Sequence, residues 1–431
     1  MYKIIGRILV GLCMSVFMGS CVLDIPEGME GDELIDKNTA VLHLNIKSLE
    51  MTTTDNPVEK IKSLRVIIVG KGEDKNPDII ECNTLVNVPN MTAQDYSYVF
   101  RWNSKPGKKD IYVLANESSV SEDFSTEIAK FREQTEAGTF SDWLNDYHFN
   151  PEYNVDSKNN IYLPYSYSYE GLEPKAGVVN TVNAWLVPVA AKFIFNFTNK
   201  RTNPVKVNGI YMSSANESNY LLAHLGSLTK EYNGEMLYWA DWLAEVSRKS
   251  WDYPGFGANE DYNREVGWIS DYYLPSPEDS KVYTFVESEV NDFTIPGATK
   301  TEEDGVETVT PQQHSTQIYY LPESINYIIS DSETPGDDQT GDSDNLKEQR
   351  FYLTLLLEDT GTSTAPEFNN VAIPNLQALF RNTYVIINIS MSDGDIEVYA
   401  EIAYWNKKTA NGWVNEGNAP SNNPFRIRNK W

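Results

Sequence analysis

The sequence predicts an all-β chain of two β-sandwich domains in tandem, with a small helical insertion. Short strand-like runs recur along the chain and are separated by clusters of Ser, Asn, Asp and Gly, which is the pattern of an all-β sandwich. Aromatic residues make up 12 % of the sequence, and the 26 tyrosines outnumber the 16 phenylalanines, a mixture that suits strands better than long helices. A length of 431 residues indicates two or three domains.

Residues 1–20 have the pattern of a secretory signal peptide. Two basic residues precede a short apolar run that is too short to span a bilayer, and small residues then lead to Cys21. This ending resembles a bacterial lipobox, with Met18 where Leu is most common, so we expect cleavage before Cys21 and lipidation of its thiol. The alternative is an ordinary signal peptide in which Cys21 is incidental. Residues 21–38 are acidic, contain Pro and Gly, and are expected to form a flexible tether.

The first domain is expected to span residues 39–188 and to begin with a half-buried strand. In residues 39–49 the side chains of Leu42, Leu44 and Ile46 fall on one face, and polar residues alternate with them. A polar loop at residues 50–59 follows this strand.

Three more strands are predicted in the first domain. Residues 60–70 have a continuous apolar centre, which fits a buried strand. Residues 96–102 and 108–116 follow the same logic, with Ser-Lys-Pro-Gly as the turn between them.

One segment of the first domain departs from the β pattern. Phe124, Ile128 and Phe131 recur at helical spacing, and Gly138 stands near the end of the segment. We therefore expect one amphipathic helix, packed on the first sandwich.

The second domain is expected to span residues 189–431. Pro188 interrupts a long apolar stretch, and because Pro cannot donate to a sheet ladder, one strand should end there and another begin shortly after. Further strands are predicted near residues 205–212, 281–287, 316–321, 350–357 and 383–391.

The clearest hairpin signal lies near the end of the chain. Asp393-Gly394 is a tight-turn dipeptide between two strand-like runs. The second run alternates strictly, and the residues that share its apolar face are Ile396, Val398, Ala400, Ile402 and Tyr404.

We find no sequence pattern for catalysis, and we expect no cofactor and no metal site. The chain lacks a nucleophile elbow, a phosphate-binding glycine loop, HExxH and CxxC, and its four histidines are far apart. The net charge of −27 should repel nucleic acid. Acidic residues at 329–346 could ligate calcium, but the spacing matches no EF-hand, which favours a solvated loop. Cys82, the remaining thiol in the folded part, is expected to be buried and structural.

An aromatic band leaves a second function open. Nine Trp, Tyr and Phe residues crowd into residues 239–273. Exposed rings can stack on sugars, so one hypothesis is a surface-exposed glycan-binding lipoprotein. The favoured interpretation is that the rings fill a small loop-rich core.

Several stretches, in order along residues 40–406, resemble the fimbrillin family, the pilus subunits of the Bacteroidia type. They include KIKSLRVIIVG with KKDIYVLANES, then VPVAAKFIFNF, then IYYLPES, and a closing hairpin. The signature residues of that hairpin are Arg381, Asn382, Tyr384, Trp405 and Asn406.

The resemblance implies two transthyretin-like sandwiches and a structural and adhesive role in a fimbria, without enzyme activity. It implies export as a lipoprotein to the outer membrane, with other pilus subunits as partners and a host or bacterial surface ligand as a further one. Subunits of the family assemble by strand exchange after a protease removes the first strand. Here that removable strand would carry Leu42, Leu44 and Ile46. The donor would be the C-terminal strands, residues 396–405, with the tail at 406–431 as a further candidate.

The sequence departs from the family at the expected cleavage site. Major subunits usually carry an Arg in the loop after the first strand, whereas residues 50–59 contain none and Lys60 stands at their edge. Arg65 lies inside the next predicted strand and should be protected. Either a protease of other specificity acts here, or the chain stays uncut and has an anchor or accessory role.

Overall fold

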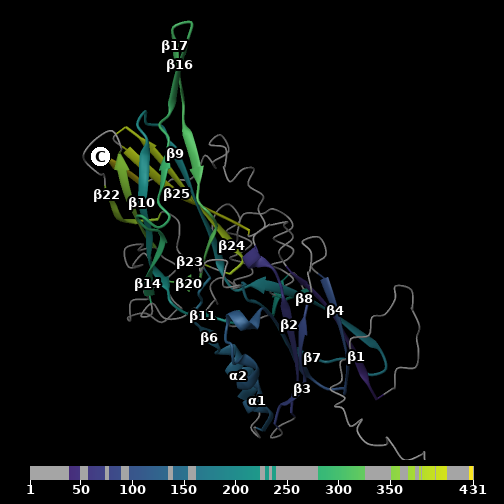
Figure 1. Ribbon diagram of the computed structural model, residues 1–431. Coiled ribbons are helices and arrows are strands. Elements are labelled where there is room, and N and C mark those ends of the chain that lie inside the picture. The colour runs from purple at the N-terminus through teal and green to yellow at the C-terminus, as the bar shows by residue number, and fades with distance from the viewer. Residues whose placement is uncertain are drawn as a thin grey trace, which may run out of the picture.

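The computed structural model describes most of the chain after residue 37. The described residues are 38–48, 57–72, 77–88, 97–133, 139–153, 162–223, 229–232, 235–238, 280–325, 351–359, 367–373, 378–379, 381–393, 395–404 and 427–430. Within these ranges, no helix has both the length and the apolar character needed to cross a bilayer. Strands dominate, and the predicted all-β fold with two sandwiches and a small helical insertion is confirmed (Figure 1).

The first sandwich is one seven-stranded sheet, in the order β3-β2-β5-β7-β8-β1-β4, folded into two layers. Strand β7 pairs with β8 at two positions, Tyr165 with Pro188 and Ser166 with Val187, and this corner joins the layers. The strands are β1 (Ala40–Ser48), β2 (Ser63–Gly70), β3 (Ile79–Asn87), β4 (Ser97–Ser104), β5 (Lys109–Ala115), β7 (Tyr165–Leu172) and β8 (Val179–Pro188).

The core of the first sandwich follows the predicted patterns. In β1 the side chains of Leu42, Leu44 and Ile46 are buried in this core, while the alternating polar residues after Val41 are partly exposed. In β2 every residue after Ser63 is buried, as the continuous apolar run predicts.

The helical insertion is divided where one helix was predicted. Helix α1 (Phe124–Ala129) continues as a 3₁₀ turn, η3 (Lys130–Glu133), and a second helix, α2 (Thr139–Asn145), follows. The predicted apolar stripe is present: Phe124 and Ile128 are buried, and Phe131 packs its ring on Trp143 of α2. Gly138 lies outside the described residues. Two further 3₁₀ turns, η1 (Pro57–Glu59) and η2 (Glu117–Ser119), flank β2 and β5.

The second sandwich consists of two sheets. One has the order β18-β9-β24-β25-β26, with β19 also pairing β9; the other has the order β14-β10-β21-β22, with β15 pairing β10. The strands of the first are β9 (Ala191–Asn199), β18 (Gln312–Ser315), β19 (Tyr319–Leu321), β24 (Thr383–Ser392), β25 (Asp395–Tyr404) and β26 (Ile427–Lys430). Those of the second are β10 (Val205–Asn216), β14 (Ser280–Val286), β15 (Phe293–Ile295), β21 (Tyr352–Asp359) and β22 (Glu367–Ala372).

The two sheets enclose a separate core, to which β9 contributes Phe193, Phe195 and Phe197. Each strand predicted in the second half has a counterpart, so those predictions are confirmed. The closing hairpin is also confirmed: β24 and β25 pair at ten positions, and Ser392 faces Asp395 across a two-residue connection.

Four small two-stranded ladders complete the described strands. They pair β6 (His148–Phe149) with β11 (Asn219–Tyr220), β12 (Thr229–Tyr232) with β13 (Glu235–Tyr238), β16 (Thr299–Glu303) with β17 (Val306–Thr310), and β20 (Ser324–Ile325) with β23 (Ala378–Leu379). The first of these ladders links the two halves of the sequence. Its neighbours Leu221 and Leu222 pack into the core of the first sandwich.

Candidate assembly site

Strand β1 occupies the centre of one layer of the first sandwich. It pairs with β4 in antiparallel fashion from Ala40 to Lys47 and with β8 in parallel fashion from Val41 to Ser48. Each neighbour therefore has eight residue pairs with β1, and both edges of β1 are used. The side chains of Leu42, Leu44 and Ile46 are each 0 % exposed. Taking β1 away would leave a groove with two backbone edges and an apolar floor.

The last part of the connection between β1 and β2 is fastened to both sandwiches. Glu59 is buried, and one of its carboxylate oxygens lies 2.9 Å from the ammonium of Lys192 on β9. Tyr320 of β19 donates its hydroxyl to the same oxygen at 2.6 Å. The backbone carbonyl of Glu59 accepts from the hydroxyl of Tyr165 on β7 at 2.8 Å. A buried carboxylate needs such partners, because an unpaired charge in the interior is costly.

Asn116 holds the next residues of this segment. Its backbone is left-handed, with φ 56° and ψ 41°, a conformation that Asn tolerates better than most residues. Its side-chain oxygen accepts from the N–H of Lys62 at 2.8 Å, and its amide donates to the carbonyls of Lys60 at 2.9 Å and Leu163 at 2.7 Å. The start of β2 is thus held independently of β1.

Arg65 is protected, as the sequence led us to expect. It is 4 % exposed and forms an ion pair with Glu117, and it also donates to Ser125 at 2.5 Å. Lys60, in contrast, is exposed. A protease acting after a basic residue in this part of the chain would therefore meet Lys60 rather than Arg65.

The predicted donor strand, β25, is built into the second sandwich. Ile396, Val398 and Ala400 are buried in its core. Ile402 and Tyr404 continue the strand and stand opposite Val385 and Thr383 in the ladder with β24; their side chains lie outside the described residues.

The first strand of each sandwich has the same kinds of neighbouring strand. Strand β9, like β1, lies between antiparallel partners, here β18 and β19, and a parallel one, β24. The second sandwich then adds β25 and β26 beyond β24. Strand β24 is the parallel neighbour of β9, as β8 is of β1, and β25 and β26 follow on the other side of β24.

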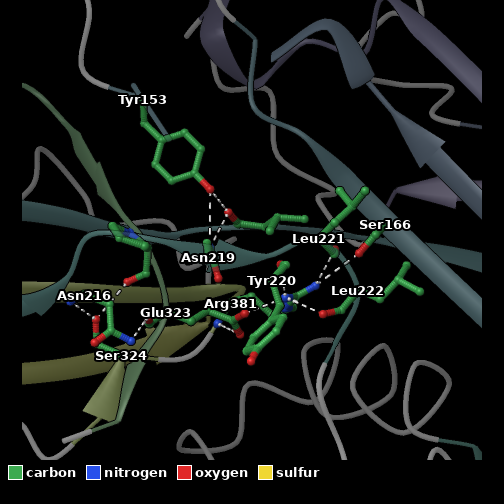
Figure 2. A network of polar contacts seen from close by, with 12 residues as sticks. Tyr153, Ser166, Asn216, Asn219, Tyr220, Leu221, Leu222, Glu323, Ser324 and Arg381 are labelled. Carbon is green, nitrogen blue, oxygen red and sulfur yellow. Dashed lines mark hydrogen bonds and ion pairs between the residues drawn. The ribbon is translucent and has the colours of Figure 1, made fainter. Parts of the chain in front are cut away.

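A buried ion pair lies at the centre of the junction between the sandwiches (Figure 2). Arg381 and Glu323 are 1 % and 0 % exposed, with 2.5 Å between guanidinium and carboxylate. The same guanidinium donates to Ser166 of β7 at 3.1 Å. It also donates to the backbone carbonyls of Tyr220, Leu221 and Leu222 at 2.9, 3.1 and 3.0 Å. Arg381 therefore ties the entry of β24 to the first sandwich.

The linker between β8 and β9 is fastened in the same region. The carbonyl of Val189 accepts from the hydroxyl of Tyr153 and from the amide of Asn219, the latter at 3.1 Å (Figure 2). These buried hydrogen bonds are expected to hold the junction in one arrangement.

The other candidate residues fall in different places. Cys21 lies outside the described residues, as do the acidic loop at 329–346 and the aromatic band at 239–273. Cys82 is buried, as predicted, and burial raises the pKa of its thiol to about 11. Among the described residues, no group of three or more His, Cys, Asp or Glu side chains could hold a metal ion.

Sequence reasoning missed two features of the structure. Glu59 and Lys192 are distant in sequence, and nothing local in either segment indicates their pairing. The hairpin of β16 and β17, in contrast, had a readable signal in Asp304-Gly305, a turn dipeptide flanked by Thr- and Val-containing runs.

The fold described above defines a class: an all-β chain of two sandwiches whose first strand lies between two neighbours. No family profile matches the sequence, and no curated protein matches it. The solved structures that a structural comparison matches to this chain include the tip fimbrial protein Mfa3 from Porphyromonas gingivalis, with a C-terminal truncation. Its TM-score is 0.44 at 13 % identity, over 85 % of this chain and 100 % of that chain. A fimbrial assembly protein from Parabacteroides distasonis has a TM-score of 0.37 at 11 % identity, over 85 % of this chain and 98 % of that chain.

Proposed function

We propose that this chain is a structural and adhesive subunit of a cell-surface pilus, exported as a lipoprotein through Cys21 and assembled by strand exchange. The observation that carries the proposal is the position of β1, a central strand paired along both edges with β4 and β8. Because β1 precedes all other strands of the sandwiches, one cut in the connection to β2 would separate it from the rest of the chain.

Loss of β1 would create a receptive surface without dismantling the first sandwich. Each of Leu42, Leu44 and Ile46 contributes about 1.5–3 kcal/mol by burial, so the emptied groove would bind a new apolar strand strongly. The backbone edges of β4 and β8 would offer their hydrogen bonds to that strand, as in β-strand addition generally. The bond from the N–H of Lys62 to Asn116 would keep the new N-terminal segment in place, and a cut before Glu59 would also retain the partners of Glu59.

The strand β25 supplies the pattern that the groove needs. Ile396, Val398 and Ala400 alternate with polar residues, as the inward residues of β1 do. Its release would expose these side chains in one subunit, and its insertion would bury them again in the next. The exchange would therefore conserve much of the apolar burial.

The proposal places the chain on the outer membrane and in the fimbria, with other pilus subunits as partners and a surface ligand as the target of adhesion. Burial of Arg65 and exposure of Lys60 support processing within residues 49–60 by a protease that does not require Arg. A chain that stays uncut and keeps lipidated Cys21 would instead serve as the anchor or as an accessory subunit.

The test is the intact mass and N-terminal sequence of the protein recovered from sheared surface filaments. A new N-terminus between residues 50 and 65 would support a polymerising shaft subunit. A lipidated Cys21 on the full mature chain would support an anchor. Absence from filaments would overturn the proposal and favour the glycan-binding alternative. That alternative requires Trp251→Ala or Trp268→Ala to abolish sugar affinity without changing assembly.

A further inference from the structure

One β-hairpin stands apart from both sandwiches. Strands β16 and β17 project from the end of the second sandwich, at the top of Figure 1, and all ten of their residues are exposed. Asp304 and Gly305 form the turn with φ 54° and 76°, the geometry of a type I′ turn that suits two-residue hairpins. A hairpin with no packed face is at best marginally stable in water, so this one gains from a partner.

The charges of the hairpin indicate what that partner carries. Residues 299–310 contain four carboxylates and one lysine, Lys300, which pairs with Glu307 at 2.6 Å. Glu302 stands directly opposite Glu307 in the ladder, although like charges in that position destabilise a hairpin. The hairpin also exposes Val306 and Val309. An external basic surface with some apolar area would relieve the repulsion and cover the valines.

Such a surface exists at the end of the first sandwich. The turn at residues 104–108 exposes Lys105 and Lys108, and the turn at residues 173–178 exposes Lys175. Glu173 is the one carboxylate of these two turns. This local excess of positive charge contrasts with the net charge of −27 for the chain.

Hydrogen bonds and strand register bring these turns together. The N–H of Gly177 donates to the carbonyl of Thr39 at 2.9 Å, and Ala40 stands opposite Ser104. Both turns therefore adjoin the start of β1. The neighbouring Val178 and Val179 are 46 % and 47 % exposed, which adds apolar area to the basic patch.

The hairpin and the basic patch lie at opposite ends of the molecule. Strand β8 reaches the junction at Pro188, so its other end, beside the start of β1, is about 30 Å away at 3.3 Å per residue. Strand β9 leaves the junction at Ala191, and β18, which follows the hairpin, pairs with its far end at Asn199. The two surfaces cannot meet within one subunit.

We propose that the β16–β17 hairpin of one copy docks on the basic patch of a second copy of this chain. The contact joins different surfaces of identical subunits, and such heterologous contacts propagate into open filaments unless they close into a ring. The inference deepens the proposed pilus assembly and rests on it for the choice of partner. Docking beside the start of β1 would hold the next subunit close to the groove in which exchange takes place.

The test uses the mature chain without its lipid in sedimentation velocity at low and high ionic strength. We expect salt-sensitive self-association, because screening weakens contacts between exposed charges. Glu302→Lys with Glu303→Lys, and separately Lys105→Glu with Lys108→Glu, should each weaken association at least tenfold. Mixing these two charge-reversed proteins should restore association, because the hairpin of each protein then has the opposite charge to the patch of the other. The matched control, Glu122→Lys with Glu152→Lys, changes net charge equally at exposed sites elsewhere and should not abolish association.

A monomeric wild type at low ionic strength would overturn the docking, as would reversed proteins that associate like the wild type or fail to associate when mixed. Strand exchange is scored separately, on filaments sheared from the cell surface, by ladders that resist SDS. Ladders without charge-sensitive association would overturn the docking alone. Charge-sensitive association without ladders would overturn strand exchange alone.

Discussion

Glu59 and Lys192 form a buried ion pair, with 2.9 Å between carboxylate oxygen and ammonium nitrogen, that joins the segment after β1 to the first strand of the second sandwich. Glu59 is 3 % exposed and Lys192 is 2 % exposed. After a cut between β1 and Glu59, the pair would stand near the new start of the chain. It therefore connects the proposed exchange groove to the junction between the sandwiches.

Removing one partner of this pair should destabilise the protein strongly. Glu59→Gln leaves the Lys192 ammonium buried without its carboxylate, and we expect a loss of about 3–5 kcal/mol in the free energy of unfolding by urea. The double variant with Lys192→Met should recover part of this loss. The same cycle on the exposed pair Lys300 and Glu307 should show a coupling below about 1 kcal/mol. Equal coupling for the two pairs would contradict the assigned role of Glu59.

Burial of Leu44 should govern how readily β1 separates from β4 and β8. Leu44→Ala removes fully buried apolar volume at the centre of the strand, at a cost of about 2–5 kcal/mol. The amides of β1 should then exchange their hydrogens at least about 30-fold faster, since about 1.4 kcal/mol corresponds to a factor of ten. His43→Ala, on the opposite face of the same strand, is the control and should leave protection within about threefold. Equal effects of the two substitutions would argue against the groove as described.

Arg381 should be sensitive even to a conservative change. Lys in its place keeps the charge but lacks the planar fork that reaches Glu323 and three backbone carbonyls, so Arg381→Lys should cost about 2 kcal/mol. Arg381→Met leaves Glu323 buried without its cation and should cost about 3–5 kcal/mol. The exposed Arg101→Lys is the control, with an expected change within about 0.5 kcal/mol. Urea unfolding measures the change in free energy of unfolding for all three variants. An unchanged stability of Arg381→Lys would show that the positive charge alone, without the guanidinium geometry, holds the junction.

The thiol of Cys82 should make stability fall at alkaline pH. Burial raises its pKa from 9.0 to about 11, so above pH 9 the unfolded chain loses this proton while the folded chain keeps it. The stability of the wild type should therefore fall, relative to Cys82→Ala, by about 1.4 kcal/mol per pH unit between pH 9 and 11. Below pH 9 the difference between the two proteins should stay constant. If the free energies of unfolding of the wild type and Cys82→Ala changed equally with pH between pH 9 and 11, this account would be contradicted.

The sequence predicted local structure well wherever apolar residues alternated regularly or a turn dipeptide was present. The alternation of Leu42, Leu44 and Ile46 located β1, and Asp393-Gly394 located the closing hairpin. The break at Pro188 coincides with the end of the last strand of the first sandwich. These features depend on neighbours in sequence, which is why they can be read from it.

The rest depends on contacts that no local pattern encodes. The parallel pairing of β1 with β8 joins residues nearly 140 positions apart, and the sequence gives no register for it. Glu59 and Glu323 are acids in segments that look like loop ends, and only the junction explains their burial. The hairpin at Asp304-Gly305 was missed because its flanks are charged rather than apolar, although its turn dipeptide was present.

The most direct test of strand exchange is to replace β1 in the intact mature protein. A specific protease site is placed within residues 49–56, the protein is cut, and an excess of a peptide with residues 395–404 is added. Native mass spectrometry should then show loss of the β1 segment and gain of one peptide. The same peptide with Ile396→Asp and Val398→Asp should not bind. A cut protein that keeps its β1 segment, or that binds both peptides equally, would contradict the assignment of β1 as the exchangeable strand.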